Sequence, residues 1–267
     1  MKENFIAYMK QHFTDWTQNG FCSAALELNK KIGEDYFSVA NPHFFTGNLD
    51  SDLVLVHLNP KISDQQKVIL SEDQQVKKPS QFNSFDDYLN YYSIFGKIKY
   101  GIEGQRVHKS PFDHKQVRFL KPFELIPLNS PNKYLNLENV IDKKLQLELI
   151  PFGSKDFNFR KVGADNLEPF IIPLLKLIGS KDRKYIIFCG RVFERLLDKY
   201  IVQKNRIKFK LKKKDGSLTN SDFEVINLKL TIDNQSFVCA IAPQFAKQGY
   251  PVEEYGHEIR KFYGNLG

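Results

Sequence analysis

Apolar residues along the chain recur with two periods, and the longer period predicts helices. They repeat every three or four positions in "NFIAYMKQHF" and in "CSAALELNKKIG", where Gly33 ends the expected helix. "DNLEPFIIPLLKLIG" predicts a helix with Asn166 as N-cap, Gly179 as its end and a kink at Pro173. Further helices are expected in "FDDYLNYYSIF" (85–95), "RVFERLLDKY" (191–200) and "VEEYGHEIRKFY" (252–263).

Short apolar runs bounded by turn residues predict strands. The run Leu53–His57 is unbroken and β-branched, which is typical of a strand covered on both faces, as in parallel sheets. Alternating helices and apolar strands predict an α/β protein, a three-layer α/β/α sandwich with a mostly parallel central sheet. The other expected strands are "FELIPLN" (123–129), "LELIPFG" (147–153), "KYIIFCG" (184–190) and "SFVCAIAP" (236–243).

We expect a single domain over residues 1–267, with insertions at about 63–118 and 203–232. The second insertion reads as a β-hairpin, because apolar residues alternate with basic ones from Arg206 to Lys212. That period predicts a half-buried strand with a basic face, and Asp215-Gly216 marks the turn before the return strand "FEVINLKL".

Composition narrows the class of protein. No run reaches the roughly eighteen apolar residues of a membrane span, and the N-terminus lacks a clean signal sequence, so a cytoplasmic protein is expected. The three cysteines are far apart and form no CxxC pair, which argues against an iron–sulfur cluster or structural zinc. His108, Asp113 and His114 match no strong ligand pattern, so we expect no metal and no cofactor.

The chain carries a net charge of +8 and has a sequence pI near 9.1, which favours nucleic acid as a partner. Solvated lysines on an ordinary surface are the alternative. Basic side chains of the predicted hairpin could follow a phosphate backbone, or they could protect an exposed edge strand from aggregation. The candidates for nucleic-acid contact in this hairpin are Lys208, Lys210, Lys212 and Lys213.

Ligands of open α/β sheets bind outside the carboxyl ends of the strands. The segments to search are therefore His57–Lys61, Pro151–Ser154, Gly190–Arg191 and Ala242–Lys247. Three of them carry motifs of one family. "VLVHLNPK" resembles the first motif of the uracil-DNA glycosylase superfamily, an apolar strand followed by Gly, two variable residues and Pro. "KYIIFCGRVFERLL" looks like that superfamily's third strand and helix, and "FVCAIAPQF" takes the place of its second motif, His-Pro-Ser after the last strand. The likeness spans roughly residues 45–262 outside the insertions, with "LELIPFG" as the strand between.

The resemblance implies an enzyme that extrudes a base from DNA and hydrolyses its bond to the sugar. Asn59 matches the position that orients the attacking water in the mismatch-specific branches, and Pro60 would fix the exit of the chain from the base pocket. The alternative for Asn59-Pro60 is a plain turn after a strand. His57 replaces the family's glycine, and it would fill part of the pocket, supply an acid–base group or only hydrogen-bond its neighbours.

Other positions depart further from the family. Ala242-Pro243-Gln244 lacks the histidine that would donate to the departing base, and losing such a donor costs about a hundredfold in rate or more. Phe152 stands where uracil-reading enzymes need an amide side chain, and it could stack on a base without selecting uracil. Gly190 would complete the base pocket.

The loop that follows the last strand is expected to contact nucleic acid through Gln244, Phe245 and Lys247. Gln244 would take the place of the family's Ser at a phosphate. Phe245 would be the wedge in the base stack, or it packs against the last helix.

Three functions remain in this order. The first is a divergent glycosylase acting on DNA, and the second is a non-catalytic nucleic-acid-binding module on the same fold, which the missing histidine favours. The third is an enzyme for a nucleotide or small molecule, in which His57 takes part. The glycosylase hypothesis requires residues 57–59 and 242–245 to lie at the same edge of the sheet.

Overall fold

The computed structural model describes residues 2–62, 79–101, 110–244 and 250–267. The chain divides into two compact units, each assembled from separate stretches of sequence. Whether both belong to the single domain expected over residues 1–267 stays a prediction. The first unit comprises Met1–Phe45, His57–Asn90 and Leu147–Ser180, and the second comprises Thr46–Val56, Tyr91–Gln146 and Lys181–Gly267.

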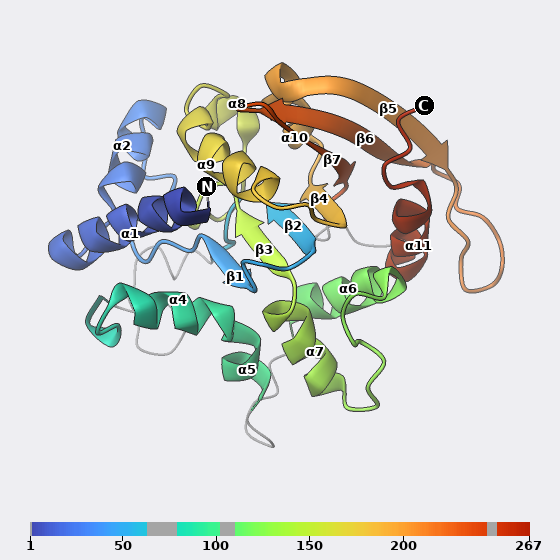
Figure 1. Cartoon of the computed structure of the whole chain (residues 1–267), viewed down its shortest axis with the longest axis horizontal. Coiled ribbons are helices and arrows are strands. Elements are labelled where there is room, and N and C mark those ends of the chain that lie inside the picture. Colours follow the sequence, from blue (N-terminus) through green and yellow to red (C-terminus); the bar gives the residue numbers. More distant parts are fainter. Residues whose placement is uncertain (1, 63–78, 102–109, 245–249) are drawn as a thin grey trace. The chain divides into compact units, whose positions relative to one another are not determined.

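Within the described residues, a seven-stranded mixed sheet runs in the order β1-β3-β2-β4-β7-β6-β5 (Figure 1). β2 pairs with β4 and β4 with β7 in parallel, whereas β6 is antiparallel to both β7 and β5. The predicted α/β class and the predicted β-hairpin are therefore confirmed. The strands are β1 (Phe45–Gly47), β2 (Leu53–His57), β3 (Leu145–Glu148), β4 (Tyr185–Cys189), β5 (Ile201–Phe209), β6 (Phe223–Ile232) and β7 (Gln235–Ala242).

The carboxyl ends of three parallel strands lie at one edge of this sheet. Val56 of β2 is in register with Phe188 of β4, and Phe188 is in register with Ile241 of β7. All five residues of β2 are buried, as its unbroken apolar run predicts. Leu53 and Leu55 belong to the large core of the second unit.

The helices of the second unit begin at recognisable caps and pack closely. Ser110 accepts a hydrogen bond from the backbone of Asp113 at the start of α6, and Asn132 caps α7. α11 approaches α6 so closely at Gly256 that a Cβ atom there would lie 2.1 Å from the carbonyl oxygen of Phe119. The helical segments are α5 (Phe95–Tyr100), α6 (Pro111–Leu120), η2 (Lys121–Phe123), α7 (Lys133–Asp142), α10 (Val192–Leu196), η3 (Asp198–Tyr200) and α11 (Val252–Phe262).

The first unit is mainly helical. Its first helix buries Phe5, Met9 and Phe13, the face that the spacing predicts, and Trp16 extends this face by one turn. The second helix ends at Gly33, which adopts a left-handed conformation as its C-cap. The helical segments are α1 (Lys2–Asn19), α2 (Ser23–Ile32), η1 (Pro79–Gln81), α4 (Phe85–Ser93), which begins here, α8 (Phe159–Val162) and α9 (Glu168–Gly179).

One predicted strand is wrong. Residues 123–129 form the end of η2 and an irregular loop, in which Glu124 has a φ of 59°. Pro122 and Pro127 lack the N–H groups that a sheet ladder requires, so this segment is poorly suited to pair as a strand. Its apolar side chains Ile126 and Leu128 are nevertheless buried in the core.

Several predicted boundaries also move. The strand expected at 147–153 is β3, which begins at Leu145 and ends at Glu148. Asn166 is not an N-cap, because its amide donates to the carbonyl of Val162 while Leu167 occupies the cap position of α9. The long helix expected after Gly190 is limited to α10 and the short η3. α9 is continuous through Pro173 and includes Gly179 as its last residue.

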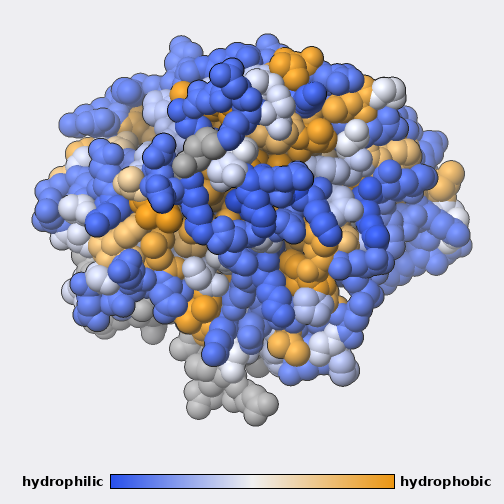
Figure 2. All heavy atoms as spheres, in the orientation of Figure 1, coloured by the Kyte–Doolittle hydropathy of each residue, from blue (hydrophilic) through white to orange (hydrophobic). Residues whose placement is uncertain are grey.

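Hydrophilic residues predominate on the face drawn in Figure 2. None of the described helices is long and apolar enough to cross a membrane. The three cysteines are buried and form no disulfide. Large apolar side chains that stay exposed are scattered over separate elements: Phe21, Ile94, Leu135, Val202 and Leu218.

Candidate functional site

The first unit holds together two loops, residues 57–62 after β2 and residues 149–156 after β3. The carbonyl oxygen of His57 accepts from the backbone N–H of Leu149 at 2.8 Å. Further along, Ser154 donates its N–H to Pro60 and accepts at its carbonyl from Ile62, each at 3.0 Å. The two loops thus continue the parallel pairing beyond the strands, which fixes their backbones relative to each other.

Asn59 bridges the two loops through its side chain. Its amide nitrogen Nδ2 donates to the hydroxyl of Ser154 at 2.8 Å, to the carbonyl of Pro60 at 3.1 Å and to that of Phe152 at 3.3 Å. Because all three partners lie on the Nδ2 side, the orientation of the carboxamide is determined by the network. Its other atom, Oδ1, accepts no hydrogen bond from any part of the chain that the structure describes.

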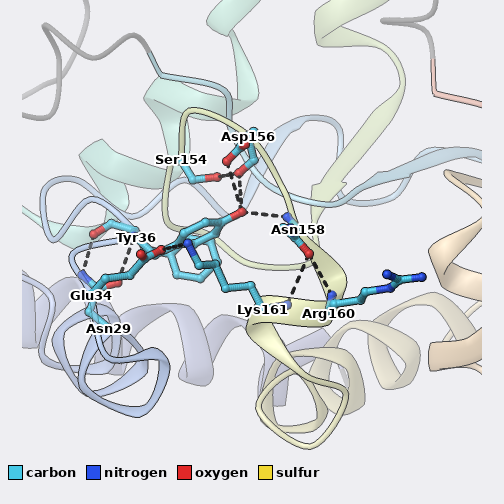
Figure 3. A network of polar contacts seen from close by, with 9 residues as sticks. Asn29, Glu34, Tyr36, Ser154, Asp156, Asn158, Arg160 and Lys161 are labelled. Atoms are coloured by element: carbon cyan, nitrogen blue, oxygen red, sulfur yellow. Dashed lines mark hydrogen bonds and ion pairs between the residues drawn. The ribbon is translucent and has the colours of Figure 1, made fainter.

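A chain of polar contacts supports Asn59 from behind (Figure 3). The Ser154 hydroxyl donates to the carbonyl of Asp156, and the phenol of Tyr36 donates to the same carbonyl at 3.0 Å. The Tyr36 oxygen also accepts from the backbone N–H of Asn158 at 2.7 Å. Burial and the nearby Asp156 carboxylate raise the pKa of Tyr36, so the phenol remains a donor at neutral pH. Residues 154–158 are therefore held in one conformation.

Phe152 does not have the role expected from the sequence. Its ring is fully buried and lies edge-on to His12 of α1 and to Phe170 of α9, with ring centroids 6.2 and 5.9 Å away. A ring enclosed in this way has no open face on which a base could stack. What Phe152 contributes to the loops is its carbonyl oxygen, the acceptor for Asn59.

His57 and Pro60 flank Asn59 in the same loop. The His57 side chain is buried, with 8% of its surface exposed, at the last position of β2. Pro60 is half-buried, and its carbonyl accepts from Asn59 Nδ2 and from Ser154 N–H. Gly153 allows the facing loop to come close, since a Cβ atom there would lie 2.6 Å from a methyl carbon of Ile62.

The second unit holds the expected residues that follow β4 and β7. The N–H of Gly190 donates to the carbonyl of Ala242 at 2.7 Å, so these two strand ends are joined directly. Gly190 has a φ of 146°, a conformation that a residue with a side chain adopts only under strain. Gln244 is exposed. The predicted contacts of Phe245 and Lys247 lie outside the described residues.

An ion network that the sequence analysis missed lies beside Gly190. Glu224 of β6 is buried, and its carboxylate binds the guanidinium groups of Arg191 and Arg206. Arg206 also pairs with Glu194, and so does Lys204. Burial works to raise the pKa of Glu194, but the hydrogen bonds and charges of Lys204 and Arg206 outweigh it and lower that pKa. The signal in the sequence was a single acidic residue in the apolar run "FEVINL".

The four candidate lysines of the hairpin, Lys208, Lys210, Lys212 and Lys213, are exposed. None of the ion pairs found among the described residues involves them. Arg206, the first basic residue of the same alternating run, differs because its guanidinium is already bound by two glutamates. The predicted basic face is therefore available to a partner from Lys208 onward.

Asp113 has a structural partner set in place of a metal. Its carboxylate binds the ammonium of Lys99 at 2.8 Å and accepts from the Tyr100 hydroxyl. Burial works to raise the pKa of Asp113, but the charge and hydrogen bond of Lys99 outweigh it and lower the pKa. Among the described residues, which exclude His108, no group of three potential metal ligands was found.

The expected meeting of Asn59 with Gln244 in one pocket involves both units and stays a prediction. The structure does bring Asn59 together with Pro60, Phe152 and Ser154 in one unit, and Gly190 together with Ala242 in the other. No protein-family model matches the chain, and comparisons with curated proteins and with solved structures found no match.

Proposed function

We propose that this chain is a divergent uracil-DNA glycosylase-like enzyme, which hydrolyses the N-glycosidic bond of a base in DNA with Asn59 as the residue that positions water. The observation that carries the proposal is the orientation of the Asn59 carboxamide. Three acceptors hold Nδ2, and Oδ1 is left as an acceptor for a water molecule. A fixed acceptor of this kind orients one lone pair of the water toward the carbon under attack.

The order of the strands also supports the proposal. The segments that resemble the family lie on β3, β2, β4 and β7, which are neighbours in the sheet in that order. Of these, β2, β4 and β7 are parallel and end at a common edge. Ligands of such sheets bind outside that edge. The proposal therefore places the base beyond the loops that carry Asn59 and Gly190.

The residues present imply slow chemistry. A carboxamide oxygen orients water but is a very weak base, so it leaves most of the proton transfer to another group or to solvent. Ala242 supplies no side-chain donor to the departing base, which removes a contribution of about a hundredfold or more. With Phe152 in the core, no residue at that position selects uracil, so the proposal does not specify the base.

Cleavage of a panel of oligonucleotide duplexes tests this function. Each duplex carries one deaminated, alkylated, oxidised or mismatched base, and abasic sites are revealed as strand breaks after alkali. We expect the wild-type protein to open at least one duplex and Asn59→Ala to open none, while its affinity for that duplex stays within about twofold, because Asn59 is proposed to touch only water.

Ser154→Ala is the matched control. It removes one of the three partners of Asn59 but keeps Oδ1, so an effect caused only by loosening of the loops would appear in both variants alike. We expect Ser154→Ala to retain most of the cleavage. Equal loss of cleavage in the two variants, or no cleavage of any duplex by the wild-type protein, contradicts the proposed role of Asn59.

A non-catalytic nucleic-acid-binding module is the second candidate, and the absence of histidine at Ala242 favours it. The exposed lysines of the hairpin support binding in either case. This candidate predicts salt-sensitive binding of DNA with no base released. Binding that does not change between low and physiological salt would exclude it.

A further inference from the structure

The segment between β5 and β6 forms an ordered arm, which we define as residues 210–219. Leu211 and Thr219 exchange two hydrogen bonds, from Thr219 N–H to the Leu211 carbonyl and from Leu211 N–H to the Thr219 hydroxyl. At the turn, Lys213 donates its N–H to Ser217 at 2.7 Å. The arm is thus a two-stranded ribbon that continues the hairpin. In Figure 1 it extends past the strand ends on the right-hand side of the view.

One face of this ribbon carries an apolar side chain among lysines. Leu211 is fully buried, so Lys210 and Lys212, its neighbours in an extended chain, point to the opposite side and are exposed. Leu218 pairs with Lys212 in an antiparallel bridge, so the two side chains share a face. More than half of the Leu218 side chain, 57%, is exposed to solvent.

The charge of the arm is strongly positive. Lys210, Lys212, Lys213 and Lys214 are exposed, and no ion pair within the described part of the chain neutralises them. The single acidic residue of the arm, Asp215, is held by hydrogen bonds from Ser217 at the turn. Lys208 extends the same exposed row into β5, whereas the next basic residue, Arg206, is bound by Glu194 and Glu224.

We propose that this arm inserts into the major groove of duplex DNA, with the lysines on the phosphates and Leu218 against the edges of the bases. The inference rests on DNA as the partner in the proposed function, but it does not depend on the chemistry of Asn59. Leu218 and Lys214 take roles here that the sequence did not indicate.

Dimensions and charge favour this partner. The major groove admits a two-stranded β-ribbon. Lysines at every second position of an extended strand are about 6.6 Å apart, so several of them reach phosphates of the same strand. Base edges in the major groove include the thymine methyl group, which is the kind of surface that an exposed leucine can cover. A purely solvated basic loop gives no reason for a leucine at its centre.

Binding of a fluorescent duplex, measured by anisotropy over a range of salt concentrations, tests the arm. Replacing Lys210, Lys212 and Lys213 together by Gln leaves up to three phosphates without a lysine partner. We expect the slope of log K against log salt to fall by about 0.9 for each of these phosphates, or about 2.7 in total. Leu218→Ser leaves the slope unchanged and weakens binding about tenfold, since it removes only an apolar interaction.

Matched variants elsewhere serve as controls. Lys30→Gln with Lys31→Gln removes exposed charges from the end of α2, and Leu135→Ser removes an exposed leucine from α7. We expect neither to alter the slope, and Leu135→Ser to leave the affinity unchanged. Equal effects of the arm and control variants, or equal affinity for single-stranded DNA and duplex, would overturn the proposal.

The outcome is separable from that of the glycosylase proposal. If the arm variants weaken binding as described and no base is ever released, the arm is supported and the glycosylase proposal fails. If a base is released and binding ignores the arm, the reverse holds. Measuring the same arm variants in the Asn59→Ala background should give the same changes in slope and affinity.

Discussion

Replacing Asn59 by Asp tests the geometry on which the proposed site depends. The change keeps the size and shape of the side chain but replaces the Nδ2 donor by an acceptor. In the folded protein that atom faces the Ser154 hydroxyl and the carbonyls of Pro60 and Phe152. A carboxylate in this position is opposed by carbonyl oxygens, so its pKa is expected to be raised above that of an ordinary aspartate.

The magnitude follows from what happens to each partner. Pro60 keeps the hydrogen bond from Ser154 N–H, and the Ser154 hydroxyl keeps its bond to Asp156. The carbonyl of Phe152 is left without its donor, which costs about 1–3 kcal/mol for a buried acceptor. Asn59→Ala is therefore expected to lower the free energy of unfolding by about 2 kcal/mol, and Asn59→Asp by about 3 kcal/mol at neutral pH, because of the added repulsion.

Urea unfolding of the wild-type protein and both variants, followed by circular dichroism, measures these differences. The pKa of the introduced carboxyl is raised in the folded state, so folding takes up a proton as the pH falls. The deficit of Asn59→Asp relative to the wild type should then shrink in mildly acid solution, where the protonated group donates again. Asn220→Asp, at an exposed position, is the control and should show no such recovery. An Asn59→Asp variant as stable as the wild-type protein at neutral pH would refute the orientation of the carboxamide.

Three further changes test other parts of the structure by the same unfolding measurement. Tyr36→Phe removes the hydroxyl that joins Asp156 to Asn158 and should destabilise the protein by about 1–3 kcal/mol; no effect would mean that the network of Figure 3 does not hold the loop. Glu224→Gln should cost about 2 kcal/mol, the lower part of the range for broken buried ion pairs because the guanidinium of Arg191 is exposed, and an unchanged stability would contradict that network. Asp113 has a lowered pKa in the folded state, so the destabilisation caused by Asp113→Asn should be constant above pH about 4 and should diminish as the pH falls further; a difference that persists in acid would refute the pairing with Lys99.

The central strands could be predicted because their sequence carries the whole signal. Leu53–His57 and Tyr185–Cys189 are apolar runs that end at turn residues, and they form β2 and β4 within a residue of the expected bounds. Residues 123–129 show why the same signal fails elsewhere. Ile126 and Leu128 reach the core from an irregular loop, so burial of apolar side chains does not by itself require a strand.

Two helices of the second unit were missed for a different reason. The segment that forms α6 is rich in charged and polar residues, and its best signals are local: Ser110 at the N-cap and Pro111 at the first helical position. Asn132 gives the same kind of signal for α7. These caps were visible in the sequence, whereas the apolar spacing on which the prediction relied is weak there.

Candidate residues were easier to find than their partners. Asn59 was identified from its place after a strand, but Ser154 is 95 positions away in the sequence. Tyr36, which holds the same loop, is 122 positions from Asn158. Contacts over such separations depend on how the chain folds, and a single sequence contains no period or spacing that reports them.

Release of a free base is the most direct test of the proposed function, and it requires no assumption about which base is recognised. Genomic DNA that has been deaminated, alkylated or oxidised is incubated with the wild-type protein or with Asn59→Ala, and small molecules are identified by mass spectrometry. We predict that at least one free base accumulates with time in the wild-type reaction and stays at background with the variant. Equal release by the two proteins, or none from any of the treated DNA, would contradict the proposal.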